Sequence, residues 1–213
     1  MIYNLEIAEQ VADFLLEIKA VILRPEQPFK WASGWNSPIY CDNRLILSYP
    51  EHRSFLKEHF SNAIAKHFND VELIAGVATA GIAHAALIAD CMNLPMAYIR
   101  SKAKEHGTGQ LIEGKIDTDQ KVVIVEDLIS TGKSSLQAAE AVINLPASVC
   151  GMVAVFTYGF NEAQKAFEDK EIPYICLSNY EVLIQRAIAK GYVKEKDLSL
   201  LEEWRKNPSE WRK

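Results

Sequence analysis

Long apolar runs are absent from the sequence, and none approaches the roughly 20 apolar residues that a membrane-spanning helix needs. A basic segment is also absent from the first ten residues, which carry acids, so we expect no secretory signal. Nor does basic charge dominate, because 23 Lys and Arg stand against 28 Asp and Glu, for a net charge of −5. That balance argues against a protein that coats nucleic acid. We therefore expect neither a membrane nor a nucleic-acid partner.

Cysteine is scarce. The four cysteines, Cys41, Cys91, Cys150 and Cys176, form no C-x-x-C pair and no cluster with histidine, which argues against a zinc site. We expect four reduced thiols packed as small apolar residues in a cytoplasmic protein. A chain of 213 residues that is 49% hydrophobic can bury a core without disulfides. The composition excludes collagenous and disordered proteins and predicts one domain over residues 1–213.

Short apolar segments alternate with helical patterns from about residue 70 to 180. The apolar segments span residues 73–78, 95–99, 121–126, 148–157 and 172–177. Because these segments lack polar alternation, we expect strands that are buried on both faces of a parallel sheet. The pattern predicts an α/β fold with helices on both faces of the sheet. Ligands in such folds bind beyond the carboxyl ends of the strands.

Shorter units flank this α/β core, which we assign to residues 69–190. Residues 1–68 are expected to form a small N-terminal lobe of helices and a hairpin. Residues 191–213 are expected to form a helical tail at the surface that frays at its end. Inside the core, His84 lies on an apolar helix, where we expect a partly buried histidine with its hydrogen bonds satisfied.

The N-terminal lobe carries three local patterns. An apolar face over residues 4–20 predicts one helix, and Pro50 opens a second helix that reaches about Phe68. Aromatic and turn-forming residues over 29–44 predict a β-hairpin with residues 39–41 as its second strand.

The strongest functional signal follows the third apolar segment of the core. Two adjacent acids, Glu126 and Asp127, end the segment, and a glycine-containing loop rich in hydroxyl groups precedes the next helix. Two carboxylates at a strand end can accept hydrogen bonds from the hydroxyls of a ribose, and N–H groups at a helix N-terminus can hold a phosphate. The segment therefore predicts a ribose 5-phosphate site. The loop residues are Ser130, Thr131, Gly132, Lys133 and Ser134.

Two other interpretations of this segment exist. The triplet Gly132, Lys133 and Ser134 is similar to the end of a nucleotide-binding P-loop, but a P-loop needs glycine where Asp127 stands. The second interpretation is an ordinary turn that follows two capping acids.

Residues 122–134 resemble the phosphoribosyl pyrophosphate signature of the type I phosphoribosyltransferases: an apolar strand, two acids, two apolar residues and Thr/Ser-x-Gly-x-Ser/Thr. The resemblance implies the parallel-sheet fold of that family. Residues 76–81 are similar to the family's pyrophosphate loop, in which backbone amides meet the diphosphate, although some members have lysine at the position of Ala80. Contacts to the donor are thereby implied for Thr79, Ala80, Glu126, Asp127, Leu128, Ile129, Ser130, Thr131, Gly132, Lys133 and Ser134.

Residues 100–115 form a charged, glycine-bearing stretch whose composition alone predicts a mobile surface loop. Its spacing Arg-x-x-x-Lys-x-His-Gly resembles the catalytic loop of orotate phosphoribosyltransferases. The resemblance implies that Arg100, Lys104 and His106 are catalytic and contact the donor, with Lys104 as the main catalytic residue. Such charges can offset the negative charge that builds on a leaving group. It also implies that the loop closes over the neighbouring subunit's active site, which would make the protein a homodimer.

The pattern Phe-x-x-x-Ser-Gly-x-x-Ser-Pro-x-Tyr in residues 29–40 resembles that family's N-terminal hairpin, which covers the base and the donor. By this resemblance, Tyr40 falls where an aromatic residue borders orotate, and Ser130 falls where a threonine contacts the base. Many members have lysine at the position of Ala32, and we expect Lys30 to substitute for it. An alternative is that the aromatic side chains of the hairpin only pack against one another.

The resemblance covers about residues 4–190 and implies an enzyme that joins orotate to phosphoribosyl pyrophosphate, releasing orotidine 5′-monophosphate and pyrophosphate in pyrimidine biosynthesis. Mg²⁺ would be held mostly by the donor, with Asp127 near it. Other branches place an arginine near Tyr158 that reaches the orotate carboxylate, so here that contact must come from elsewhere. Two alternatives stay open. One is a type I phosphoribosyltransferase for another nucleobase, such as a purine or uracil, and the other is a non-catalytic regulator that senses the same donor.

Overall fold

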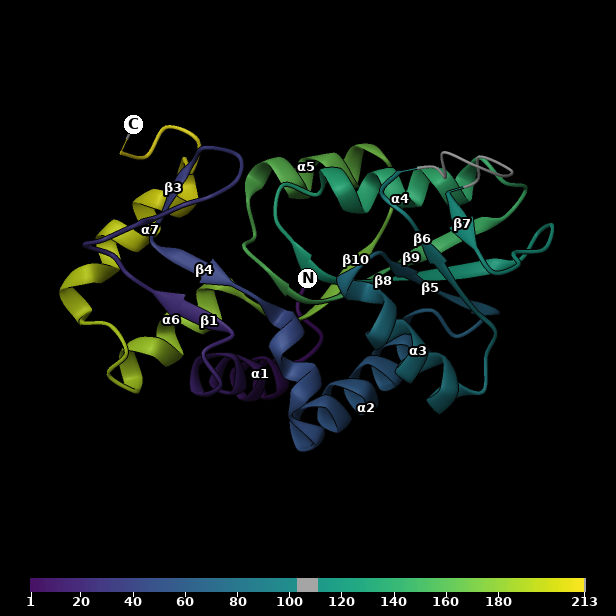
Figure 1. Cartoon of the computed structure of the whole chain (residues 1–213), viewed down its shortest axis with the longest axis horizontal. Coiled ribbons are helices and arrows are strands. Elements are labelled where there is room, and N and C mark those ends of the chain that lie inside the picture. The colour runs from purple at the N-terminus through teal and green to yellow at the C-terminus, as the bar shows by residue number, and fades with distance from the viewer. Residues whose placement is uncertain (103–110, 213) are drawn as a thin grey trace.

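A six-stranded sheet lies at the centre of the molecule (Figure 1). Its order across the sheet is β10 (Tyr174–Asn179), β9 (Ser148–Thr157), β8 (Lys121–Ile129), β5 (Leu73–Val77), β6 (Met96–Ile99) and β7 (Ile112–Glu113). Neighbouring strands are parallel except β7, which runs antiparallel to β6. The structure, a computed structural model, describes residues 1–102 and 111–212. The α/β fold with a parallel sheet predicted from the sequence is confirmed.

Helices cover both faces of this sheet (Figure 1). One face carries α4 (Lys133–Ile143) and α5 (Asn161–Asp169), and the other carries α1 (Leu5–Glu17), α2 (Pro50–His67) and α3 (Ala80–Met92). Successive residues of a strand point to opposite faces. Val123 of β8 therefore packs with α1, α2 and α3, and Val122 packs with α4 and α5. This two-sided burial explains why the strands read as continuous apolar runs.

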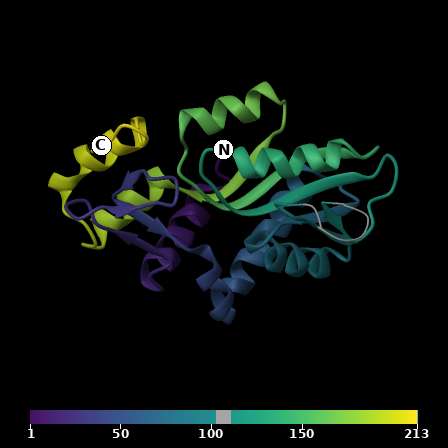
Figure 2. The same cartoon turned by 45° about the horizontal axis from the view of Figure 1, so that its top comes forward.

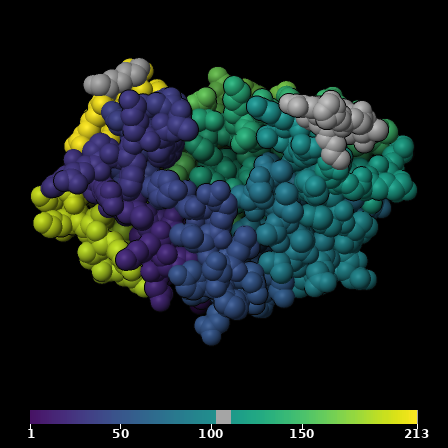
Figure 3. All heavy atoms as spheres, viewed as in Figure 1, coloured from purple at the N-terminus to yellow at the C-terminus, as the bar shows by residue number. Residues whose placement is uncertain are grey.

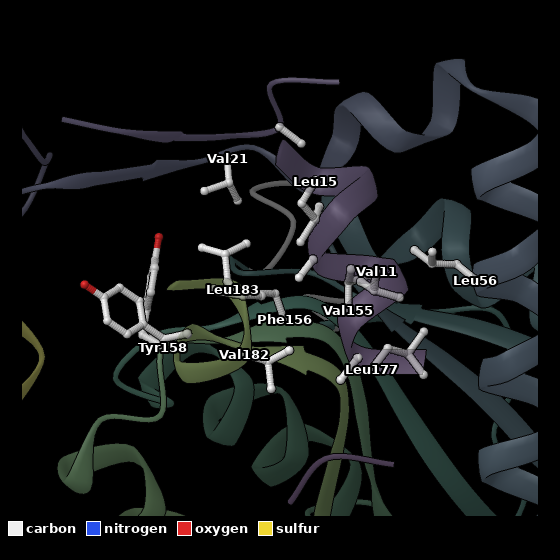
Figure 4. Packing of buried hydrophobic residues seen from close by; sticks show 14 of the residues in the cluster. Val11, Leu15, Val21, Leu56, Val155, Phe156, Tyr158, Leu177, Val182 and Leu183 are labelled. Atoms are coloured by element: carbon white, nitrogen blue, oxygen red, sulfur yellow. The ribbon is translucent and has the colours of Figure 1, made fainter. Parts of the chain in front are cut away.

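The larger core lies between the sheet and the helices of the N-terminal lobe (Figure 4). Val11 and Leu15 of α1 and Leu56 of α2 belong to one cluster with Val155 of β9 and Leu177 of β10. The spacing of four residues between the two α1 side chains places them on one helix face. The apolar stripe predicted for this helix is thus the face that the sheet covers.

The hairpin of the N-terminal lobe differs from the prediction. β4 (Ile39–Cys41) pairs antiparallel with β1 (Val21–Leu23). A separate short ladder joins β2 (Phe29–Lys30) to β3 (Asn36–Ser37). Pro38 stands between β3 and β4, and proline has no N–H with which to continue a strand ladder. The prediction of residues 39–41 as the second strand of the 29–44 hairpin was therefore wrong.

The C-terminal tail contains the expected helix, but one face of that helix is buried. After α6 (Tyr180–Ala189) and the short η2 (Glu195–Asp197), α7 (Leu198–Lys206) lies against the N-terminal lobe (Figure 1). Trp204 is 0% exposed and Trp211 is 6% exposed. The burial of the two tryptophans was not expected, because the charged residues of this segment, most of them exposed, dominate its composition.

The structure also corrects two smaller expectations. His84 is buried, and its Nε2 has no hydrogen-bond partner among the residues described. Burial lowers the pKa of His84 to about 4. All four cysteines are free thiols, but Cys91 is exposed rather than packed in the interior. In the described part of the chain, no helix has the length and apolar character needed to cross a membrane.

Candidate active site

The carboxyl ends of β8 and β9 lie against the N-terminal lobe. Asn43 of the lobe donates a hydrogen bond to the carbonyl oxygen of Asp127, and Trp31 packs on Tyr158, which follows β9. Figure 3 shows the surface hollowed between the purple and blue residues of the lobe and the green residues beyond the sheet. This is the edge at which ligands of α/β proteins bind.

Glu126 and Asp127 lie inside β8 rather than at its end. The strand continues to Ile129, which pairs with Thr157 of β9. The expectation that the acids end the strand was wrong, because β9 is long enough to extend the ladder past them. The acids nevertheless lie near the carboxyl edge of the sheet, where a ligand can reach them.

The two acids form a hydrogen-bonded pair with unequal burial. Glu126 is 5% exposed, and its Oε2 accepts a hydrogen bond from the Ser135 hydroxyl at 3.3 Å. Its Oε1 accepts another from the Asp127 N–H at 3.1 Å. Burial, aided by the charge of Asp127, raises the pKa of Glu126 well above its usual range, and burial also raises the pKa of Asp127. Two neighbouring carboxyl groups can accept hydrogen bonds from the adjacent hydroxyls of a ribose.

The loop after β8 turns into α4 at Gly132, whose φ of +81° lies in the left-handed region. A Cβ at this position would lie 3.1 Å from the ring of Phe167, so space and backbone both favour glycine. Gly132 is the N-cap of α4, and no side chain among the residues described caps the helix. The N–H groups of its first turn, from Lys133 onward, are therefore left for a ligand, and a helix N-terminus favours an anion. Residues 130–134 thus form a strand-to-helix turn of the kind that can bind an anion.

Thr79 and Ala80 lie where β5 turns into α3. Gly81 approaches β8 so closely that a Cβ there would collide with the Val125 carbonyl. The same Cβ would lie 3.4 Å from the Cα of Glu126. The close approach therefore brings the predicted pyrophosphate loop alongside the acid pair.

Arg100 follows β6 at the same edge of the sheet. Its side-chain Nη1 lies 3.4 Å from Oε1 of Glu113 on β7, and its backbone N–H donates to the Leu111 carbonyl at 2.8 Å. Lys104 and His106 lie outside the described residues, so their catalytic roles stay predictions.

A cavity of about 300 Å³ lies between the lobe and β8. It is called the acceptor cavity below because it is lined by the residues expected to contact the base. Its lining residues are Lys30, Trp31, Ala32, Tyr40, Cys41, Leu128, Ser130 and Tyr158. The structure thus brings together the three residues expected to contact the base, Lys30 and Tyr40 from the lobe and Ser130 from the loop after β8. Ile129 instead has its side chain fully buried in the core, so it can reach a ligand only through its backbone. A larger cavity of about 550 Å³ between α6 and α7 contains none of the predicted site residues.

Comparison with known proteins identifies the family. The phosphoribosyl transferase domain family matches residues 48–190. An orotate phosphoribosyltransferase of Cytophaga hutchinsonii is 56% identical over 205 residues, which are 96% of this chain and 98% of that protein. One of Listeria innocua is 51% identical over 209 residues, covering 98% of this chain and 100% of the relative. This chain belongs to the orotate phosphoribosyltransferase family.

Two solved structures have the same fold as this chain. UMP synthase of Leishmania donovani superposes with a TM-score of 0.76 at 23% identity, covering 92% of this chain. This chain spans only 42% of the synthase chain. Orotate phosphoribosyltransferase from Aeropyrum pernix superposes with a TM-score of 0.72 at 21% identity, covering 86% of this chain and 99% of that one. At these identities the likeness shows the fold alone.

The sequence alone did not indicate a role for Asn43. In this member of the orotate phosphoribosyltransferase family, Asn43 joins the lobe to the acid pair. Asn43 is 1% exposed at the start of η1 (Asn43–Ser48). Its Nδ2 donates to the Asp127 carbonyl at 2.7 Å, and its Oδ1 accepts from the Cys41 thiol at 3.2 Å. The available signal was the polar triplet at 42–44 directly after an apolar strand, because a buried amide needs partners for both ends.

Proposed function

We propose that this chain transfers the 5-phosphoribosyl group from phosphoribosyl pyrophosphate to orotate, giving orotidine 5′-monophosphate and pyrophosphate in pyrimidine biosynthesis. The observation that carries the proposal is the position of Ser130, which lines the acceptor cavity and also begins the phosphate loop of the donor. A base in the cavity would therefore lie beside C1 of a ribose held at the loop. The relatives named orotate phosphoribosyltransferases span nearly the whole chain, which supports orotate as that base.

The donor, in this proposal, is held by three neighbouring segments. Glu126 and Asp127 exchange hydrogen bonds with the ribose hydroxyls. The first N–H groups of α4 and the hydroxyls of the 130–134 loop hold the 5-phosphate. The backbone amides of Thr79 and Ala80 contact the diphosphate, which is the leaving group.

The reaction breaks the bond between C1 of the ribose and an oxygen of the diphosphate and forms a bond between C1 and N1 of orotate. N1 loses its proton, which passes to the released diphosphate or to water. Positive charge develops on the ribose while negative charge grows on the diphosphate. We infer that Arg100, Lys104 and His106 offset the negative charge, because preorganised cations act strongly where water is excluded. Closure of the 100–115 loop would also keep water from hydrolysing the donor.

Mg²⁺ is the proposed cofactor, and the donor set at the acid pair is compatible with it. Magnesium usually keeps several waters and takes one or two carboxylates together with substrate oxygens. Asp127, whose side chain is only partly buried, would lie beside the ion. Within residues 1–102 and 111–212 no group of three His, Cys, Asp or Glu side chains converges, so substrate oxygens would supply the other ligands. When bound, Mg²⁺ would neutralise charge on the diphosphate.

Orotate carries a carboxylate, and Lys30 is the charged side chain among the described residues that line the acceptor cavity. We infer that the Lys30 ammonium pairs with that carboxylate and that Tyr40 covers the ring. Tyr158 is 2% exposed, and burial raises its pKa well above its usual range, so it presents a neutral, mostly covered ring.

The active enzyme is proposed to be a homodimer in which residues 100–115 of one protomer close over the partner's site. A hybrid experiment tests the sharing. Lys104→Ala and Asp127→Asn chains are co-expressed in equal amounts and assayed at a donor concentration well below the KM, where each parent keeps about a tenth of the wild-type activity or less. Half of the dimers are then hybrids. If each site is shared between protomers, every hybrid has one intact site out of two, so about a quarter of the wild-type activity should return. No gain over the two parents would contradict the sharing, and light scattering gives the mass of the particle.

The first test of the activity is an ultraviolet assay with Mg²⁺ and phosphoribosyl pyrophosphate. Orotate, uracil, hypoxanthine, adenine and xanthine are offered separately. We expect turnover with orotate alone. Turnover with another base would refute the assignment of the acceptor, and donor binding without any turnover would favour the sensing regulator. The cytoplasmic location stays a prediction that cell fractionation tests.

A further inference from the structure

The C-terminal segment, residues 198–212, lies beside the strands of the N-terminal lobe (Figure 2). It is outside the range of residues 48–190 that matches the phosphoribosyl transferase domain. Trp204 of α7 is fully buried there, and its Nε1 donates to the Asn36 carbonyl at 3.2 Å. The segment is thus anchored to the hairpin that lines the acceptor cavity.

Trp204 contacts both walls of the acceptor cavity. Its ring meets the ring of Trp31 edge-on, with centroids 5.6 Å apart at 85°. It meets Tyr158 in the same way, at 5.7 Å and 89°. The ring centroids of Trp31 and Tyr158 lie 5.2 Å apart. Both residues line the cavity, Trp31 from the lobe and Tyr158 from the end of β9. Edge-to-face pairs of this kind favour one relative orientation of the rings.

Other contacts of the same segment hold the same two walls. Arg205 donates from Nη2 to the Gly159 carbonyl at 3.4 Å, in the turn after β9. Arg212 donates from Nη1 to the Pro25 carbonyl at 3.1 Å, and its own carbonyl accepts a hydrogen bond from the Asn36 amide. The lobe and the end of β9 are therefore joined through residues 198–212 as well as directly.

We propose that Trp204 is a positioning residue for the acceptor base, because it holds Trp31 and Tyr158 in the arrangement that shapes the acceptor cavity. The proposal rests on the proposed function. Lys30 is adjacent to Trp31 in the chain, so a shift of the hairpin would move its ammonium away from the base. The proposed donor site is built instead from α4 and from residues at the ends of β5, β6 and β8. A change at Trp204 therefore weakens binding of the acceptor and leaves binding of the donor nearly unchanged.

The test compares Trp204→Leu and Trp204→Phe in the full chain. Trp204→Leu is expected to raise the KM for orotate about tenfold, while the KM for phosphoribosyl pyrophosphate stays within about twofold. Trp204→Phe keeps a ring but loses the Nε1–H, and it should raise the KM for orotate by about two- to threefold. Calorimetric titration with orotate in the presence of pyrophosphate gives a second readout without turnover.

Phe68→Leu is the matched control. Phe68 is 6% exposed and packs against Gly151 near the start of β9, at the opposite end of the sheet. The Phe68→Leu substitution should lower the free energy of unfolding while leaving the KM values for orotate and for phosphoribosyl pyrophosphate unchanged. The positioning role is refuted if Trp204→Leu raises both KM values equally or raises neither. If that variant does not fold, Trp204→Phe decides in the same way.

The proposed function is judged separately, by wild-type turnover across the five bases. If the wild type used another base and Trp204→Leu raised only the KM for that base, the positioning role would stand and the assignment of orotate would fall.

Discussion

Replacing Asn43 by alanine removes the link between the N-terminal lobe and the acid pair. The substitution deletes the 2.7 Å hydrogen bond to the Asp127 carbonyl and leaves that carbonyl and the Cys41 thiol without this partner. A lost hydrogen bond costs about 1 kcal/mol, and a buried polar group left unpaired costs about 1–3 kcal/mol. Since Asn43 is 1% exposed, we expect the free energy of unfolding to fall by about 2–3 kcal/mol.

The same change loosens the backbone that carries the Asp127 carboxylate, so the KM for phosphoribosyl pyrophosphate should rise about fivefold. Urea unfolding measures the stability, and initial rates at saturating orotate measure the KM. Asn62→Ala is the matched control, because Asn62 is exposed on α2 and its loss should change stability by less than about 0.5 kcal/mol. If Asn43→Ala behaved like Asn62→Ala in both measurements, the reasoning about this contact would be refuted.

Three further predictions address the loop, the acid pair and a buried histidine. Lys104→Ala should lower kcat at least about a hundredfold, since it removes a charge that acts on the leaving group, and leave urea unfolding unchanged; an unchanged kcat would refute the loop assignment. Asp127→Asn should weaken donor binding about tenfold in calorimetry, because a neutral amide accepts hydroxyl hydrogen bonds less strongly, and unchanged affinity would exclude the ribose role. The pKa of His84 is lowered from 6.5 to about 4 in the fold, so the unfolded chain binds the proton first as the pH falls. Stability should therefore drop by about 3 kcal/mol between pH 6.5 and pH 4 in urea unfolding. His84→Met should flatten that part of the profile, and parallel profiles for the two proteins would show that other groups cause the drop.

The donor half of the candidate site could be predicted from sequence because it is local. Glu126, Asp127 and the 130–134 loop are contiguous, and a strand followed by a glycine turn and a helix is encoded by neighbouring residues. The parallel sheet was also predictable, since only strands covered on both faces read as unbroken apolar runs. The residue at which β8 ends was not predictable, because the length of a strand depends on how far its neighbour extends.

The acceptor half was only partly predictable. The family resemblance pointed to Lys30 and Tyr40, but the residue patterns alone could not predict that these side chains line one cavity with Ser130. Asn43 was missed because its partner Asp127 is 84 residues away in the chain. No local pattern encodes a contact at that separation.

By itself, the sequence determined the α/β class, the strand–loop–helix of the proposed donor site and the family signatures, since each depends on the order and period of nearby residues. Only the tertiary structure decided which strand pairs with residues 39–41, because alternation shows which face of a strand is buried and not which strand lies beside it. It also decided the place of the tail, where Trp204 reaches Asn36 across 168 residues of chain. Burial of an aromatic ring is a property of the assembled surfaces around it, and a mostly charged segment conceals it until those surfaces meet.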